Sequence, residues 1–157
     1  GGRLLCSEAD GRTGTVEELD IGAGPGALVR RETRGFVYPL TIVEMSDPRL
    51  AGTVTWAWDE DEYRGASAAA PRVGTGTLRI ENDEGAWEGG FRSAHLTETG
   101  WATVVLPLAG EGAYIGRMAL WELDYEPDMP EGRCGWHVRG LVIAADDLQA
   151  VPEAAGP

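Results

Sequence analysis

Apolar and polar residues alternate along several short segments of the chain, as expected for strands that are buried on one face. In residues 118–125 this alternation places Trp121, Leu123 and Tyr125 on one side of the segment, opposite Glu122 and Asp124. No window of about 12 residues sustains the 3.6-residue apolar period of an amphipathic helix. We therefore expect strands and little α-helix.

Turn-forming residues separate these segments at intervals typical of sandwiches and barrels. Asp47 and Pro48 predict one turn, Asn82 to Gly85 predict a hairpin, and the acidic residues 59–62 are expected to leave their strand as a solvated loop. The predicted strands span residues 15–21, 36–45, 52–58, 74–81, 86–93, 100–108, 114–125 and 134–145.

About eight antiparallel strands predict an all-β fold, a single closed β-barrel, because closure removes the exposed edges of the sheet. A two-layer β-sandwich is the alternative, since both folds require one inward face per strand. The length of 157 residues corresponds to about one domain. We assign residues 1–145 to the barrel and residues 146–157, which are rich in Pro and Ala, to a flexible C-terminal tail.

The period of two also predicts which side chains face the interior. In the last strand one register turns Trp136 and Val138 inward and the other turns His137 and Arg139 inward, and the pattern leaves both open. A carboxylate, Glu44, continues an inward apolar face. The other residues predicted to face inward are Phe36, Tyr38, Leu40, Ile42, Val54, Trp56, Trp58, Trp87, Gly89, Phe91, Trp121, Leu123 and Tyr125.

The formal net charge of -13 makes nucleic acid and anionic lipid surfaces unlikely partners, because both require concentrated positive charge. No apolar stretch approaches the length of a membrane span, and the first residues lack the order of a signal peptide. A disulfide between the two cysteines would need an oxidising compartment, so the compartment stays open, with the cytoplasm slightly favoured. Cys6 and Cys134 form either a disulfide or two free thiols, and their spacing gives no metal signature. We expect neither a metal nor a cofactor.

Aromatic residues with polar atoms are unusually frequent, with six Trp and four Tyr against two Phe. Such side chains suit the wall of a ligand cavity, because they combine apolar area with a hydrogen-bonding group. The sequence predicts a substrate-binding set of Tyr38, Trp56, Trp58, Trp87, Phe91, Trp121 and Leu123. The candidate catalytic residues, which would orient a reacting carbonyl, are Glu44, Tyr125, His137 and Arg139.

The run Gly110-Glu-Gly-Ala-Tyr-Ile-Gly116, followed by a strand, resembles the glycine-aromatic-glycine turn of the allene oxide cyclase barrel superfamily, which includes dirigent proteins and bacterial spirotetronate cyclases. Residues 46–52 and 76–89 are also similar to segments of small bacterial barrel proteins. The resemblance implies a cofactor-free eight-stranded barrel whose lumen folds a reactive intermediate. It also implies that Trp121, Leu123 and Tyr125 point into that lumen.

These features give three hypotheses of different classes. The first is a cofactor-independent cyclase or isomerase that acts on a hydrophobic small molecule by confinement. The second is a non-catalytic, lipocalin-like barrel that binds an apolar ligand, and the third is an interaction domain with a packed interior. A homodimer is expected through outward apolar residues such as Val104, Leu106 and Leu108.

Overall fold

The computed structural model describes residues 1–7, 13–22, 27–65, 71–95, 103–126, 129–130 and 133–144. Nine strands and one short 3-10 helix, η1, form this part of the chain. The elements are β1 (Gly2–Ser7), β2 (Thr13–Ile21), β3 (Leu28–Met45), η1 (Pro48–Leu50), β4 (Thr53–Arg64), β5 (Arg72–Asn82), β6 (Gly85–His95), β7 (Thr103–Gly112), β8 (Arg117–Glu126) and β9 (Arg133–Ala144). The predicted tail lies outside the described residues.

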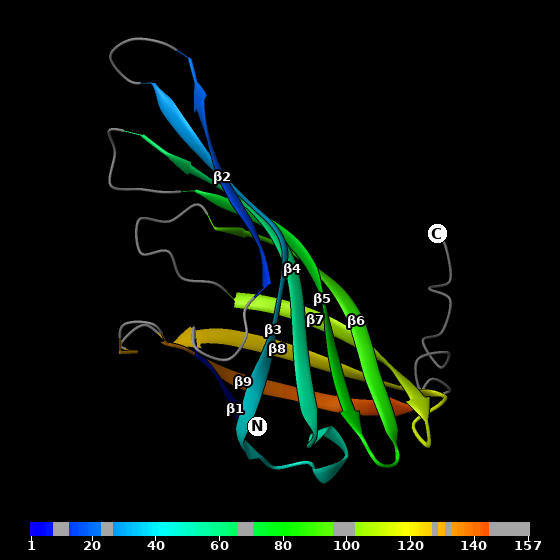
Figure 1. Ribbon diagram of the computed structural model, residues 1–157. Coiled ribbons are helices and arrows are strands. Elements are labelled where there is room, and N and C mark those ends of the chain that lie inside the picture. The colour runs from blue at the N-terminus through cyan, green and yellow to red at the C-terminus, as the bar shows by residue number, and fades with distance from the viewer. Residues whose placement is uncertain are drawn as a thin grey trace, which may run out of the picture.

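The strands form one antiparallel sheet that closes on itself, so the barrel prediction is confirmed and the sandwich is not the fold. The order is β1-β9-β8-β7-β6-β5-β4-β3-β2, and β1 also pairs with β3, which closes a barrel of eight strands. The alternation did not predict β1, although this short strand lies at the seam between β3 and β9. Figure 1 shows β3 to β6 crossing in front of β7, β8 and β9 at a large angle.

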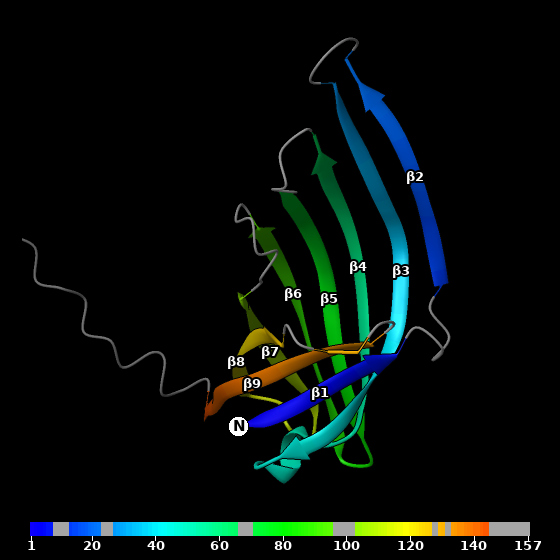
Figure 2. The same cartoon turned by 90° about the vertical axis from the view of Figure 1, so that its left-hand side faces the viewer.

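One side of the sheet extends far beyond the other, as Figures 1 and 2 show. We call this extension the wing; it consists of β2, residues 28–35 of β3, residues 59–64 of β4, residues 72–75 of β5 and residues 92–95 of β6. The prediction of a solvated loop at residues 59–62 is wrong, because these acids continue β4. They remain in the strand because arginines on β3 and β5 pair with them, as described below.

A β-bulge in β3 marks the boundary between barrel and wing. Thr33 pairs with Glu60, whereas Phe36 pairs with Trp58, so β3 contains one extra residue here. Gly35 has φ +61°, a left-handed conformation that costs a residue with a Cβ more than it costs glycine. The bulge bends the strand and resets which residues face inward.

The barrel interior is a continuous apolar core. Trp56, Trp121, Leu106 and Leu123 are at most 1% exposed, so a water molecule cannot touch most of their surface. An eight-stranded barrel is just wide enough for side chains to fill it. The core therefore stabilises the fold by excluding water along the whole described length of the barrel.

The end of the barrel opposite the wing is closed by η1 and by the turn between β7 and β8. Leu50 of η1 is buried, and Trp87 donates its indole Nε1–H to the Arg49 carbonyl oxygen at 2.9 Å. Tyr114 stacks on Trp87 with ring centroids 4.8 Å apart. The predicted strand over 114–125 thus begins only at Arg117, since Tyr114 belongs to the turn and caps the core.

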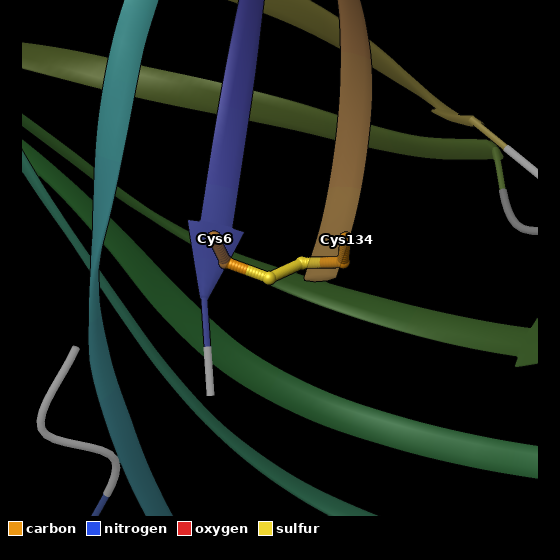
Figure 3. Close-up of a disulfide and its surroundings, with 2 residues drawn as sticks. All are labelled: Cys6 and Cys134. Carbon is orange, nitrogen blue, oxygen red and sulfur yellow. A yellow bond between two sulfur atoms is a disulfide. The ribbon is translucent and has the colours of Figure 1, made fainter. Parts of the chain in front are cut away.

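A disulfide joins the first strand to the last, as Figure 3 shows. Cys6 and Cys134 are directly paired across β1 and β9, with their Cα atoms 5.1 Å apart. Of the two possibilities that the sequence left open, the structure contains the disulfide. The bond fixes the seam strand β1 to β9 near the wing end of the barrel.

Candidate functional site

The prediction of inward-facing aromatic residues is confirmed for the barrel. Trp87 and Trp121 lie inside with Trp56 and Leu123, each at most 1% exposed, and Phe91 is 7% exposed. Surfaces that water cannot reach do not line a cavity that a substrate could occupy. These residues therefore pack against one another, and a lumenal substrate would need space that their burial does not provide.

The aromatic side chains nearest the wing form a cluster around Trp56. Phe91 meets the Trp56 ring edge to face at a centroid distance of 5.2 Å, and Trp136 stacks on it at the same distance. Trp58 and Tyr125 are half-buried at the rim of this cluster, in contact with Trp56 and Trp136 respectively. The buried indole N–H groups of Trp56 and Trp136 have no hydrogen-bond acceptor among the described residues.

For Tyr38 only the backbone is described, and it pairs with Trp56. The predicted position in the strand is thus correct. The role predicted for its side chain lies outside what the structure describes.

The prediction that Glu44 faces the interior is wrong. Leu4 of β1 pairs with Ile42, whereas Arg3 pairs with Glu44, so a second bulge in β3 falls between these pairs. The extra residue shifts the alternation by one. Glu44 is exposed as a result, and Met45 packs against the core in its place.

The last strand adopts the register that turns Trp136 and Val138 inward. His137 and Arg139 lie on the outer face, with 60% and 66% of their side chains exposed. Arg139 donates to Asp124 at 2.6 Å and to Glu122 at 3.2 Å. The structure therefore does not bring the four predicted catalytic residues together: Glu44, His137 and Arg139 are outside the barrel, and Tyr125 is inside.

The residues proposed for a homodimer contact also face the other way. Val104, Leu106 and Leu108 are at most 3% exposed and belong to the core, so the prediction that they lie on the exterior is wrong. The alternation was correct but was assigned to the wrong face. The exposed large apolar side chain of β7 is that of Val105, at 56%.

A network of ion pairs covers the inner face of the wing. By alternation along β4, Glu60 and Glu62 continue the face of Trp56 and Trp58. Glu62 is 6% exposed and accepts hydrogen bonds from Arg64 at 2.9 Å and from Arg72 at 3.3 Å. Arg31 lies 3.8 Å away on β3.

The arginines around Glu62 keep its carboxylate charged. Burial raises the pKa of Glu62, but the Arg64 hydrogen bond and the charges of Arg72, Arg64 and Arg31 outweigh it, so the pKa lies below its usual value. A similar pair of arginines, Arg30 and Arg34, holds Asp61 on the outer face. These contacts explain why an acidic run forms a strand rather than a loop.

The barrel wall opens between β6 and β7. The described ladder between these strands runs from Gly85 with Gly112 to Glu88 with Ala109 and ends there. Pro107 lacks the N–H that a longer ladder would need, and a Cβ on Gly89 would overlap the Pro107 carbonyl oxygen. Figure 1 shows the two strands leaving their shared corner in different directions.

An open groove of about 480 Å³ lies where the strands part. It combines an aromatic ring, one aliphatic side chain, two hydroxyl groups and a guanidinium with two glycines that leave the backbone uncovered. Its lining residues are Thr75, Gly76, Thr77, Gly90, Phe91, Arg92 and Val105. Sequence reasoning found only Phe91 among them.

Two sequence signals could have indicated this groove. Consecutive glycines, Gly89 and Gly90, stand in the middle of a predicted strand, and Pro107 stands in another. Glycine in a strand often marks a bulge or a close approach of two backbones, and proline is restricted to edges and irregular positions. Together they predict a break in the ladder, although not which strands adjoin it.

In the part of the chain that the structure describes, no three His, Cys, Asp or Glu side chains gather as metal ligands. None of the described helices has the length and apolar composition needed to cross a membrane. The groove has a volume and a mixed apolar and polar lining in the range of small-molecule sites.

Comparison of the chain with protein-family models, with curated proteins and with solved structures finds no match in any of the three. The resemblance to the allene oxide cyclase barrels thus stays a prediction. The structure by itself establishes the barrel fold.

Proposed function

We propose that the protein is a non-catalytic binding barrel that holds a small molecule with an apolar body in the groove between β6 and β7. The observation that carries this proposal is the groove's volume of about 480 Å³, together with its mixed apolar and polar lining. Ligand pockets typically measure roughly 300 to 1,000 Å³ and combine apolar walls with a few polar groups.

The apolar contacts of such a ligand would come mainly from Val105 on β7, together with the small part of Phe91 on β6 that is exposed. Val105 is 56% exposed, and an apolar ligand would remove this surface from water. The ring of Phe91 touches Trp56, so a ligand at Phe91 lies one side chain away from the aromatic cluster. Binding should therefore change tryptophan emission.

The cyclase hypothesis drawn from the sequence remains a prediction. It needs a lumen that holds a substrate, whereas Trp87, Trp121 and Leu123 are at most 1% exposed. The binding hypothesis needs only the groove. For this reason we favour binding over turnover.

Gly90→Leu is the variant that tests the site. Gly90 is exposed, and an added Cβ would have its nearest described atom, the Gly76 carbonyl oxygen, at 3.6 Å, an ordinary contact. The leucine side chain would then occupy the groove without disturbing the backbone. Thr41→Leu adds a similar side chain at an exposed position of β3 and serves as the matched control.

The measurement is calorimetric titration with a panel of neutral apolar compounds, followed by recovery of each compound from the mixture. We expect at least one compound to bind the wild type and the Thr41→Leu variant and to be recovered unchanged, with affinity reduced at least tenfold by Gly90→Leu. Equal affinity in the wild type and Gly90→Leu would place the ligand elsewhere. A converted compound would restore the cyclase hypothesis.

A further inference from the structure

We propose that the ligand of the groove carries a carboxylate, which Arg92 binds with help from the hydroxyls of Thr75 and Thr77. This inference rests on the proposed function and names the class of ligand that the groove selects. The predicted ligand is thus an apolar monocarboxylic acid rather than a neutral apolar compound.

The first observation is that Arg92 has no hydrogen bond or ion pair in the described part of the chain. The arginines around it are paired: Arg64 and Arg72 with Glu62, and Arg79 with Glu88 at 2.7 Å. Acids outnumber bases by 26 to 13 in this chain, so an arginine without a carboxylate partner is unexpected. Among the described residues nothing accepts from the five N–H donors of its guanidinium, so these donors suit an anionic ligand.

The second observation is the position of Arg92 in the groove. It pairs with Thr75 across β5 and β6, and Thr77 pairs with Gly90 two residues along, so these side chains share one face of the sheet. Gly90 leaves the space between them open. A carboxylate at this place could accept from the guanidinium and from a threonine hydroxyl at the same time.

The third observation concerns charge. One guanidinium matches one negative charge, and the formal net charge of -13 disfavours ligands that carry several. A carboxylate is therefore a better match than a phosphate dianion or a polyanion. The exposed side chain of Val105 on the facing strand provides a surface for the apolar body of the acid.

The test compares acids with alcohols of the same shape. The probes are 2-naphthoate with 2-naphthalenemethanol, 4-biphenylcarboxylate with 4-biphenylmethanol, and decanoate with decanol, each titrated at pH 7 into the wild type. Charge-assisted hydrogen bonds are about twice as strong as neutral ones, so we expect the acid of at least one pair to bind roughly tenfold more tightly than its alcohol.

Variants of Arg92 assign the preference to this side chain. Arg92→Gln should bind acid and alcohol equally while its affinity for the alcohol stays unchanged, and Arg92→Lys should keep part of the preference. Arg139→Gln removes an exposed arginine on β9 that, unlike Arg92, is held by Glu122 and Asp124, and that is separated from β7 by β8; this variant should keep the full preference.

The outcomes separate this inference from the proposed function. If acids and alcohols bind the wild type equally and Gly90→Leu weakens both, the groove is a ligand site but the carboxylate preference is wrong. If the preference survives in Arg92→Gln, another group recognises the acid and the inference is overturned. If no probe of any pair binds, the proposed function fails together with the inference.

Discussion

The barrel and the wing use the same strands for two different kinds of stabilisation. On the inner face of β4, Trp56 packs in an apolar core, whereas Glu62 six residues later lies among arginines. The strands of the barrel form a ring around its core, so most of its inner face is dry. The wing lacks a second layer in the described structure, and its inner face is instead covered by paired charges.

The comparison shows that strand alternation specifies a face, not an environment. The core contributes through water exclusion, which grows with buried area. The ion pairs contribute less, because each arginine around Glu62 is about two-fifths exposed and solvent screens the charges. We therefore expect the barrel to be far more sensitive to substitution than the wing.

The largest expected effect is in the barrel core. Trp121→Ala should lower the free energy of unfolding by about 3–5 kcal/mol, because it removes a side chain that is 1% exposed and leaves a cavity. Urea unfolding followed by circular dichroism measures this change. Leu141→Ala, at a position 52% exposed on β9, is the control and should change stability by less than about 0.5 kcal/mol. Similar losses in both variants would mean that the core is not tightly packed.

The second-largest loss of stability is expected from removal of the disulfide. It links residues 128 positions apart, and the Cys6→Ser, Cys134→Ser double variant should lose roughly 2–5 kcal/mol because the unfolded chain is no longer constrained. A reducing agent should destabilise the wild type to a similar extent and leave the double variant unchanged. If the reducing agent has no effect on the wild type, the two thiols are free in solution.

The same bond bears on the compartment. Disulfides persist in oxidising compartments and are rare in the cytoplasm. The sequence left the compartment open, with the cytoplasm slightly favoured, and the bond between Cys6 and Cys134 would persist only in an oxidising one.

A smaller effect is expected in the wing. Glu62→Gln leaves Arg31, Arg64 and Arg72 without their shared carboxylate and should cost about 1–2 kcal/mol, since its partners are partly solvated. Urea unfolding at low and high salt measures the loss and its screening. A cost as large as that of Trp121→Ala would contradict the distinction between barrel and wing.

The contribution of Glu62 should also depend on pH with a definite sign. Its folded-state pKa lies below the value of 4.5 expected in the unfolded chain, so its stabilisation is fully present above that value. It is lost as the pH falls through the folded-state pKa. The stability difference between wild type and Glu62→Gln should therefore be constant from pH 7 to about pH 5 and shrink below about pH 4. A stability difference that grows as the pH falls would mean that the folded-state pKa of Glu62 is not lowered.

The smallest expected effect is on the outer face of β9. Arg139→Gln removes an arginine whose side chain is 66% exposed, and exposed ion pairs contribute little, so stability should change by less than about 0.5 kcal/mol. Ligand affinity should not change either. A large loss of ligand affinity in this variant would instead mean that Arg139 has a functional role, as the sequence analysis predicted.

The alternation predicted much of the barrel but not its boundaries. It placed Trp56, Trp87 and Trp121 inside correctly, because a closed sheet must bury one face of every strand. It misplaced Glu44, since one extra residue in β3 shifts all later side chains to the opposite face. Nothing in the local pattern marks that residue.

The sequence by itself determined an all-β chain and the inward face of most barrel strands, because both follow from a local period of two. Tertiary structure alone decided that β1 closes the seam, that Cys6 meets Cys134 and that the acids of β4 meet arginines. It also decided that β6 and β7 part beside Phe91 and Arg92. Each of these features joins residues far apart in the chain, and their proximity depends on strand order and register.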